Sequence, residues 1–174
     1  MNNPKIFSNY PLWMVFAVNI LMLTVYAAGA YILFTLGLVT GMLYVLFLLL
    51  LEVQVYREGC VNCFYYGKRC AFGKGIIAAM LFKKGNPKKF CEREIKFKDL
   101  IPQALVILIP VIIGIVLLVS RGFNLFILAA MLYPVISWFA VNPVVYGRLA
   151  CPHCKQGSIC CPALKFFTKA KKKK

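Results

Sequence analysis

The feature that most constrains this chain is a pair of long stretches almost without charge. No charged residue lies between Lys5 and Glu52, and only Arg121 lies between Asp99 and Arg148. Each stretch is about twice the roughly 20 residues that a helix needs to cross a bilayer. Hydrophobic residues make up 61% of the chain and mean hydropathy is +0.78, well above the balance typical of soluble domains. We therefore predict an all-α polytopic membrane protein with four transmembrane helices.

The four helices are expected to form two hairpins. Pro11 opens the first helix, which runs to about Ala28, and a tight turn over 29–33 leads to a second helix that ends near Tyr56. The second hairpin runs over 102–119 and 125–146, with a turn at 120–124. Proline is tolerated at the first position of a helix, and prolines inside helices bend them, as expected at Pro110 and Pro134.

The distribution of basic residues predicts the orientation. The formal net charge is +16, and 11 of the 21 basic residues fall in 57–98, with another eight in 148–174. Basic loops are retained on the cytoplasmic side, so we expect both of these segments and both termini to be cytoplasmic, in a multi-pass protein of the cell (inner) membrane. The same charge attracts anionic lipid headgroups, and it does not require a nucleic-acid partner.

Two cysteine motifs of identical spacing lie in these basic segments. Both read C-x2-C-x6-C, and they are 91 residues apart; their members are Cys60, Cys63 and Cys70 in the first, and Cys151, Cys154 and Cys161 in the second. The same offset relates Arg57 to Arg148 and Pro11 to Pro102. We interpret the chain as one membrane domain, 1–174, with an internal repeat over 10–98 and 101–174. Parallel repeats are related by an axis along the membrane normal, which predicts equivalent sites near that axis.

Cysteines spaced in this way on the cytoplasmic side favour metal binding over structural disulfides. None of the eight cysteines falls inside a predicted span. Zinc prefers four ligands, whereas each motif supplies three; the fourth ligand could be Cys91 in the first half, and Cys160 or His153 in the second. An iron–sulfur cluster is also held by cysteine thiolates, and the six motif cysteines could share one site. Arg57 and Arg148 could offset the thiolate charge, or they could be ordinary anchors at the inner leaflet.

Thiol–disulfide chemistry is the third interpretation. The tetrapeptide Cys151-Pro-His-Cys154 resembles the active-site sequence of the DsbA-type oxidoreductases, and the resemblance implies a redox-active cysteine pair. In that family the motif opens a helix on a thioredoxin-like fold, but no βαβ pattern surrounds it here. Its counterpart, Cys60-Val-Asn-Cys63, lacks the Pro-His pair.

Several function classes are excluded by what the chain lacks. Its one histidine rules out a bis-histidine haem, and no acidic residue lies at mid-membrane depth, where proton pathways usually carry one. The sequence thus predicts an integral membrane metal-binding protein, with an iron–sulfur electron-transfer role between a cytoplasmic donor and a membrane acceptor or partner. The alternatives are a zinc-stabilised adaptor that presents a basic surface to another protein, and a membrane thiol–disulfide oxidoreductase.

Overall fold

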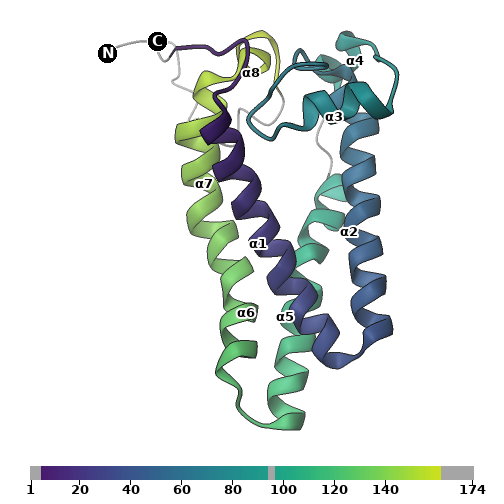
Figure 1. The fold of residues 1–174 in the computed structure, drawn as a ribbon, viewed down its shortest axis with the longest axis vertical. Coiled ribbons are helices and arrows are strands. Elements are labelled where there is room, and N and C mark those ends of the chain that lie inside the picture. The colour runs from purple at the N-terminus through teal and green to yellow at the C-terminus, as the bar shows by residue number, and fades with distance from the viewer. Residues whose placement is uncertain (1–4, 94–96, 162–174) are drawn as a thin grey trace. The chain divides into compact units, whose positions relative to one another are not determined.

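The computed structural model describes residues 5–93 and 97–161, and its regular elements are helical (Figure 1). One isolated bridge, between Phe7 and Cys154, is the only β-type pairing found in the described part. The elements, in chain order, are α1 (Leu12–Leu36), α2 (Leu38–Glu58), η1 (Cys60–Asn62), α3 (Lys74–Leu81), α4 (Pro87–Glu92), α5 (Phe97–Arg121), α6 (Leu125–Ile136), η2 (Ser137–Val141), α7 (Asn142–Val144), η3 (Val145–Ala150), η4 (Cys151–His153) and α8 (Lys155–Ile159).

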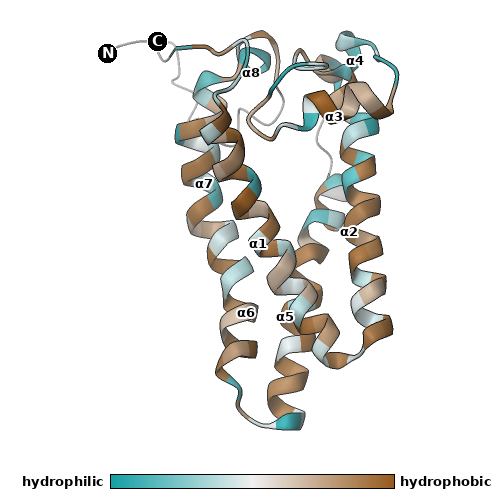
Figure 2. Ribbon diagram, viewed as in Figure 1, coloured by the Kyte–Doolittle hydropathy of each residue, from teal (hydrophilic) through white to brown (hydrophobic). Residues whose placement is uncertain are grey.

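Four helical segments of the described chain are long and apolar enough to cross a membrane. They are Leu12–Leu36, Leu38–Asn62, Asp99–Arg121 and Leu125–His153, and hydrophobic residues predominate along them in Figure 2. A helix satisfies its backbone hydrogen bonds internally, as a lipid environment requires. The predicted all-α class and the four candidate spans are confirmed, while the orientation stays a prediction. The second and fourth segments continue through Cys60 and Cys151, which we had expected to lie beyond the spans.

The break between the first two helices lies at Gly37, so the predicted turn at 29–33 is wrong. Residues 29–33 are helical, and α1 continues to Leu36. Gly29 is needed for packing rather than for a turn, because a Cβ there would lie 2.5 Å from the Tyr44 hydroxyl. At the real break, the Thr40 hydroxyl donates to the carbonyls of Leu33 and Gly37 at 2.9 and 2.8 Å. The same two carbonyls also accept the backbone N–H groups of Gly37 and Gly41.

The second hairpin differs from prediction at its start and near its end. Helix α5 begins at Phe97, so Pro102 lies inside it instead of opening it. The turn is placed as expected, with α5 ending at Arg121 and the Asn124 side chain capping α6. Beyond Pro134, two π-helical turns, η2 and η3, flank α7. Proline removes a helical hydrogen bond, and the helix widens where Pro134 and Pro143 interrupt it.

The described chain divides into two compact units. The first comprises residues 5–19, 54–93 and 142–161, and the second comprises 20–53 and 97–141. The second unit contains a core of aliphatic and aromatic side chains from the four long helices, among them Ile32, Leu48, Leu117 and Ile127. Inside it, the buried Tyr44 hydroxyl donates to the Val106 carbonyl at 2.8 Å. Large apolar side chains such as Leu46, Leu49 and Val116 remain exposed on its surface, as lipid-facing side chains do.

Candidate thiol site

Both cysteine motifs lie in the first unit and begin with the same local conformation. Each first cysteine starts a short 3-10 turn, preceded by a small residue with φ and ψ of −103° and −65° at Gly59 and −92° and −62° at Ala150. Each turn closes when the N–H of the second cysteine donates to the carbonyl of the first, at 3.3 Å for Cys63 and 3.2 Å for Cys154. The matching sequence spacing therefore corresponds to matching backbone geometry.

The two motifs share one apolar cluster. Its buried members are Tyr10, Met14, Tyr65, Ala71 and Ala150, and Cys63, Cys70 and Cys154 pack against them. The thiols are near enough to influence one another's protonation: Cys63 is affected by Cys154, Cys70 and Cys60, and Cys154 by Cys161 and Cys70. Cys151 also interacts with Cys154 and Cys161. Cys154 therefore interacts with four of the other five motif cysteines, Cys63, Cys70, Cys151 and Cys161.

Two buried tyrosines border the thiols. The Tyr10 hydroxyl donates to the Ala150 carbonyl at 2.6 Å and lies within hydrogen-bonding reach of the Cys154 thiol. Tyr65 packs edge-on against Tyr10, with 5.6 Å between ring centroids. Burial raises the pKa of both hydroxyls, that of Tyr65 to about 12, and the neighbouring thiols raise them further. Both tyrosines are therefore neutral hydrogen-bond donors at physiological pH.

The thiols at the centre of the cluster are also held neutral. Burial raises the pKa of Cys63 to about 12, against a smaller opposing hydrogen bond from the Tyr65 backbone. Burial likewise raises the pKa of Cys154, although hydrogen bonds from the N–H groups of Gly157 and Gln156 partly oppose it. A thiol attacks a disulfide only as the thiolate, so these two cysteines are poor nucleophiles near neutral pH.

The segment before α1 lies across both motifs. The Phe7 N–H donates to the His153 carbonyl at 3.0 Å, and the Phe7 carbonyl accepts from the Tyr65 hydroxyl at 2.6 Å. Further along, the Tyr10 N–H donates to the Arg69 carbonyl at 2.9 Å. Residues 5–10 therefore join the first motif to the second. We call this segment the N-terminal strap.

Helix α3 supports the loop between the second and third cysteines of the first motif. The Gly67 N–H donates to the Gly75 carbonyl at 2.9 Å. Gly75 itself packs directly on the loop backbone, because a Cβ there would overlap the Tyr65 carbonyl and lie 2.5 Å from the Lys68 carbonyl. Glycine is used where two backbones must approach so closely. The opposite face of α3 exposes Ile77 and Met80.

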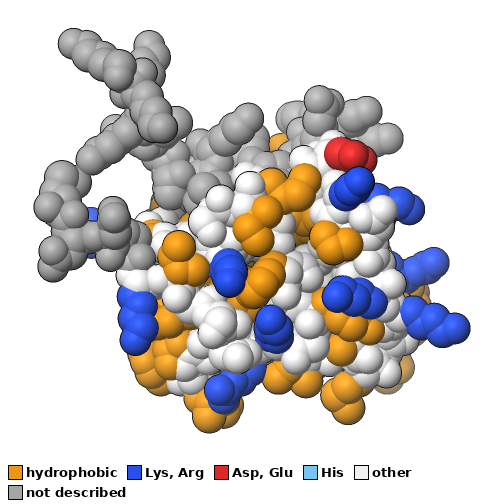
Figure 3. All heavy atoms as spheres, turned by 90° about the horizontal axis from the view of Figure 1, so that it is seen from above, with side chains coloured by type: hydrophobic (Ala, Val, Ile, Leu, Met, Phe, Trp, Pro, Cys, Tyr) orange, Lys and Arg blue, Asp and Glu red, His pale blue; other side chains and the backbone are white. Residues whose placement is uncertain are grey.

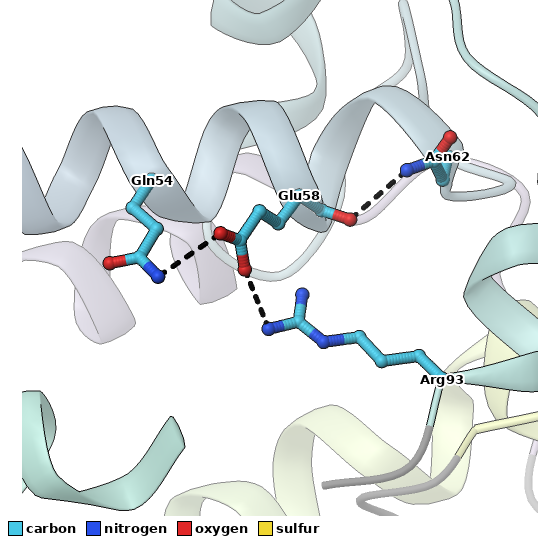
Figure 4. Close-up of polar contacts among 4 residues, drawn as sticks. All are labelled: Gln54, Glu58, Asn62 and Arg93. Atoms are coloured by element: carbon cyan, nitrogen blue, oxygen red, sulfur yellow. Dashed lines mark hydrogen bonds and ion pairs between the residues drawn. The ribbon is translucent and has the colours of Figure 1, made fainter. Parts of the chain in front are cut away.

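The end of α2 is tied to the loop that follows α4 (Figure 4). The Glu58 carboxylate accepts hydrogen bonds from Gln54 at 3.1 Å and from Arg93 at 2.8 Å. The Asn62 side chain, inside the first motif, donates to the Glu58 carbonyl at 3.0 Å. The Gly85 N–H also donates to the Val61 carbonyl at 3.0 Å. These contacts fix the first C-x2-C turn at the end of its helix.

The cysteines outside the motifs pair with each other. Cys91, on α4, and Cys160, after α8, form a disulfide with 5.3 Å between their Cα atoms. We had considered each as a fourth metal ligand in its own half, and a disulfide sulfur does not serve as a thiolate ligand. His153, the third such candidate, is stacked on Phe7, and its Nδ1 lies 2.6 Å from the Lys5 carbonyl oxygen. None of the six motif cysteines takes part in a disulfide.

Positive charge surrounds the motifs on the exposed surface. Figure 3 shows Lys and Arg side chains scattered among hydrophobic ones over the face seen from above. Arg57 and Arg148, the predicted charge-compensating pair, are both exposed. Lys68 and Lys155 lie closer to the cluster, with their ammonium groups 4.5 and 4.9 Å from the centroid of the Phe64 ring.

The donor set does not form a ready-made metal site. Within residues 5–93 and 97–161, no three His, Cys, Asp or Glu side chains lie in an arrangement that could hold a metal ion. Cys63, Cys70 and Cys154 pack in one cluster, but the motif thiols are not positioned around one point. Any metal would have to draw them together.

Three residues of this site were missed by sequence reasoning. They are Tyr10, Tyr65 and Gln156, and none of them belongs to a motif of its own. Tyr65 and Gln156 occupy equivalent positions in the two motifs, 91 residues apart, but their residue types differ, so the repeat does not mark them.

The fold and the site together define a helical protein with four candidate membrane spans and a half-buried cluster of free thiols drawn from two matching motifs. Comparisons with protein-family models, with curated proteins and with solved structures give no match.

Proposed function

We propose that this protein binds a metal centre through the thiolates of its two cysteine motifs, at the surface of the membrane that holds its helices. The observation that carries the proposal is the packing of Cys63, Cys70 and Cys154, from both motifs, in one apolar cluster. Free cysteines of this spacing, gathered from distant parts of a chain, are what a thiolate-bound metal requires.

The protonation of the thiols favours metal binding over dithiol catalysis. Reactive cysteines of oxidoreductases have lowered pKa values, whereas burial raises those of Cys63 and Cys154. A bound cation reverses this preference, because a coordinating thiol loses its proton to the metal. Binding should therefore release protons and weaken as the pH falls.

An iron–sulfur cluster remains our preferred centre, and zinc the alternative. With Cys91 and Cys160 joined to each other, six thiols are left, three in each motif. Three ligands per motif suit a cluster with an open iron or a centre shared by both motifs, better than two complete zinc sites. A cluster would supply electron transfer between a cytoplasmic donor and a membrane acceptor. Zinc would instead fix the basic loops for a partner protein.

Metal analysis of the purified full chain tests the proposal. The protein is purified anaerobically in detergent, and its iron, sulfide and zinc contents and its visible spectrum are measured. Brown protein with iron and sulfide supports the cluster, and colourless protein with stoichiometric zinc supports the adaptor function. Metal-free protein that takes up neither metal on reconstitution, with six alkylatable thiols, refutes metal binding.

A dithiol function is the second candidate. It is favoured by the Cys91–Cys160 disulfide, which shows one cysteine pair at bonding distance, and by the Cys151-Pro-His-Cys154 sequence. If this candidate is correct, the Cys151–Cys154 dithiol should reduce an added disulfide to two thiols while it becomes a disulfide itself, and Cys151→Ser and Cys154→Ser should each abolish this exchange. Equal exchange rates in wild type and both variants would exclude it.

We further propose that the motifs face the cytoplasm, where the basic loops contact anionic lipid headgroups. A membrane-impermeant maleimide added to intact cells should leave Cys70 and Cys161 unlabelled until the membrane is broken. Labelling of either thiol in intact cells would reverse the orientation.

A further inference from the structure

The contacts between the two motifs are reciprocal. The Phe64 N–H donates to the Gln156 side-chain oxygen at 2.7 Å, and the Lys155 N–H donates to the Tyr65 hydroxyl at 2.9 Å. Phe64 and Lys155 are equivalent positions, 91 residues apart, and so are Tyr65 and Gln156. In each motif, the first residue after the C-x2-C turn donates its backbone N–H to the side chain of the second residue after the turn in the other motif.

Other equivalent residues contact each other directly. The Lys155 ammonium lies over the ring of its counterpart Phe64, 4.9 Å from the centroid. Cys63 and its counterpart Cys154 pack against the same buried residues. In an arrangement with two-fold symmetry, residues near the axis meet their own counterparts, and residues farther away form reciprocal pairs. Both kinds of contact are present here.

We infer that the two motifs pair about a local two-fold axis between Cys63 and Cys154, and that they form one shared thiolate site, held in register by Tyr65 and Gln156 as positioning residues. This inference rests on the proposed function for the metal, but the pairing itself does not depend on it. It selects one shared centre over the two separate, equivalent sites that the repeat alone would predict.

The two positioning side chains also connect the pair to its surroundings. The Tyr65 hydroxyl, besides accepting from Lys155, donates to the Phe7 carbonyl of the N-terminal strap at 2.6 Å. The Gln156 amide donates to the Cys160 carbonyl at 2.9 Å. The Tyr65 hydroxyl and the Gln156 amide therefore each accept one hydrogen bond and donate another, as a buried polar group requires. Tyr65 and Gln156 are 2% and 5% exposed, so water cannot replace these bonds.

Cross-linking in the full chain tests the pairing without any metal. A variant with Cys60, Cys70, Cys151 and Cys161 changed to serine keeps Cys63 and Cys154 free, and it is treated in detergent with dibromobimane, which joins two neighbouring thiols. Mass spectrometry of peptides from the monomer then separates a bridged product from two single adducts. We expect the bridged Cys63–Cys154 product to predominate. Single adducts on both thiols, with no bridge, would overturn the inference.

Matched variants test the positioning role. Tyr65→Phe combined with Gln156→Ala removes both reciprocal bonds, and it should lower the ratio of bridged to single adducts roughly tenfold. The control is Tyr66→Phe combined with Ser158→Ala, which removes hydroxyl bonds that do not cross between the motifs, to Phe82 and to Lys155. The control should keep the wild-type ratio. An equal fall in the ratio of bridged to single adducts in both variants would show that Tyr65 and Gln156 have no specific positioning role.

Metal stoichiometry then distinguishes one site from two in protein that binds metal. With a shared centre, Cys63→Ser and Cys154→Ser should each remove most of the bound metal, and the double variant should lose little more. With two separate sites, each single change removes half, and the double change removes all. If no metal binds at all, the proposed function fails, and the cross-linking result still decides whether the motifs pair.

Discussion

Replacing Gly75 by alanine should open the thiol site. The added Cβ would overlap the Tyr65 carbonyl and lie 2.5 Å from the Lys68 carbonyl. Both are backbone atoms, so α3 has to move away from the loop, and the Gly67–Gly75 hydrogen bond of 2.9 Å is lost with that movement. Tyr65 is then no longer held against the second motif.

The expected cost follows from these two effects. Overpacking of a tight site costs about 1–3 kcal/mol, and a lost hydrogen bond adds about 1 kcal/mol. A total of about 2–4 kcal/mol corresponds to an increase of roughly 30-fold to several hundred-fold in the open population. Opening of part of a structure can be measured separately from global unfolding, and here Cys63 serves as the reporter.

The assay is the rate of Cys63 modification by a maleimide in the detergent-solubilised full chain, followed by mass spectrometry of its peptide. The Gly75→Ala variant should label faster than wild type by the factor given above. Gly37→Ala is the matched control, because the nearest atom to a Cβ there, the Thr40 hydroxyl oxygen, lies at an ordinary 3.6 Å. Labelling of Gly75→Ala at the wild-type rate would refute the argument that α3 supports the site.

Three further changes have expected outcomes. Burial raises the pKa of Cys63 from 9.0 to about 12, so between these pH values the folded chain keeps a proton that the unfolded chain loses. The free energy of unfolding should therefore fall from about pH 9 to 12, by up to ~1.4 kcal/mol per pH unit. Denaturation of wild type and Cys63→Ala across this range should show a shallower fall in the variant. Gly29→Ala, with its Cβ 2.5 Å from the Tyr44 hydroxyl, should cost about 1–3 kcal/mol and lower the melting temperature, and an unchanged melting curve would contradict the close packing. Arg93→Gln breaks the exposed 2.8 Å ion pair with Glu58 and should change the unfolding free energy by no more than about 1 kcal/mol, whereas a larger loss would mean that this contact holds the loop in place.

The four candidate membrane helices were predictable because length and hydropathy alone specify them. The residues at which they begin and end were harder to predict. Gly29 and Gly37 look alike in the sequence, yet one allows close packing inside a helix and the other separates two helices. The difference depends on Tyr44, which lies on α2, fifteen residues further along the chain, and packs against Gly29. The π-helical turns beyond Pro134 likewise depend on how each interrupted hydrogen bond is replaced, which a proline in the sequence does not reveal.

The grouping of the motif cysteines was predictable, and the contacts around them were not. The spacing identified the six motif cysteines as a set, because C-x2-C turns have a specific local geometry. It did not reveal the partners of Cys91 and Cys160, since a disulfide depends on the folded distance between α4 and the end of α8. The contacts of Tyr65 and Gln156 across the motifs also arise only when distant segments fold together.

The thiol site has a consequence for how the protein is made. Its unit consists of three separate segments, 5–19, 54–93 and 142–161, and the N-terminal strap bonds to Tyr65 and His153. Chains are synthesised from the N-terminus at about 5–20 residues per second, so the strap emerges from the ribosome long before the second motif exists. The spans can insert one after another during translation, but the strap has to wait for the last segment. The site is therefore completed only after the last of the four candidate spans has been synthesised.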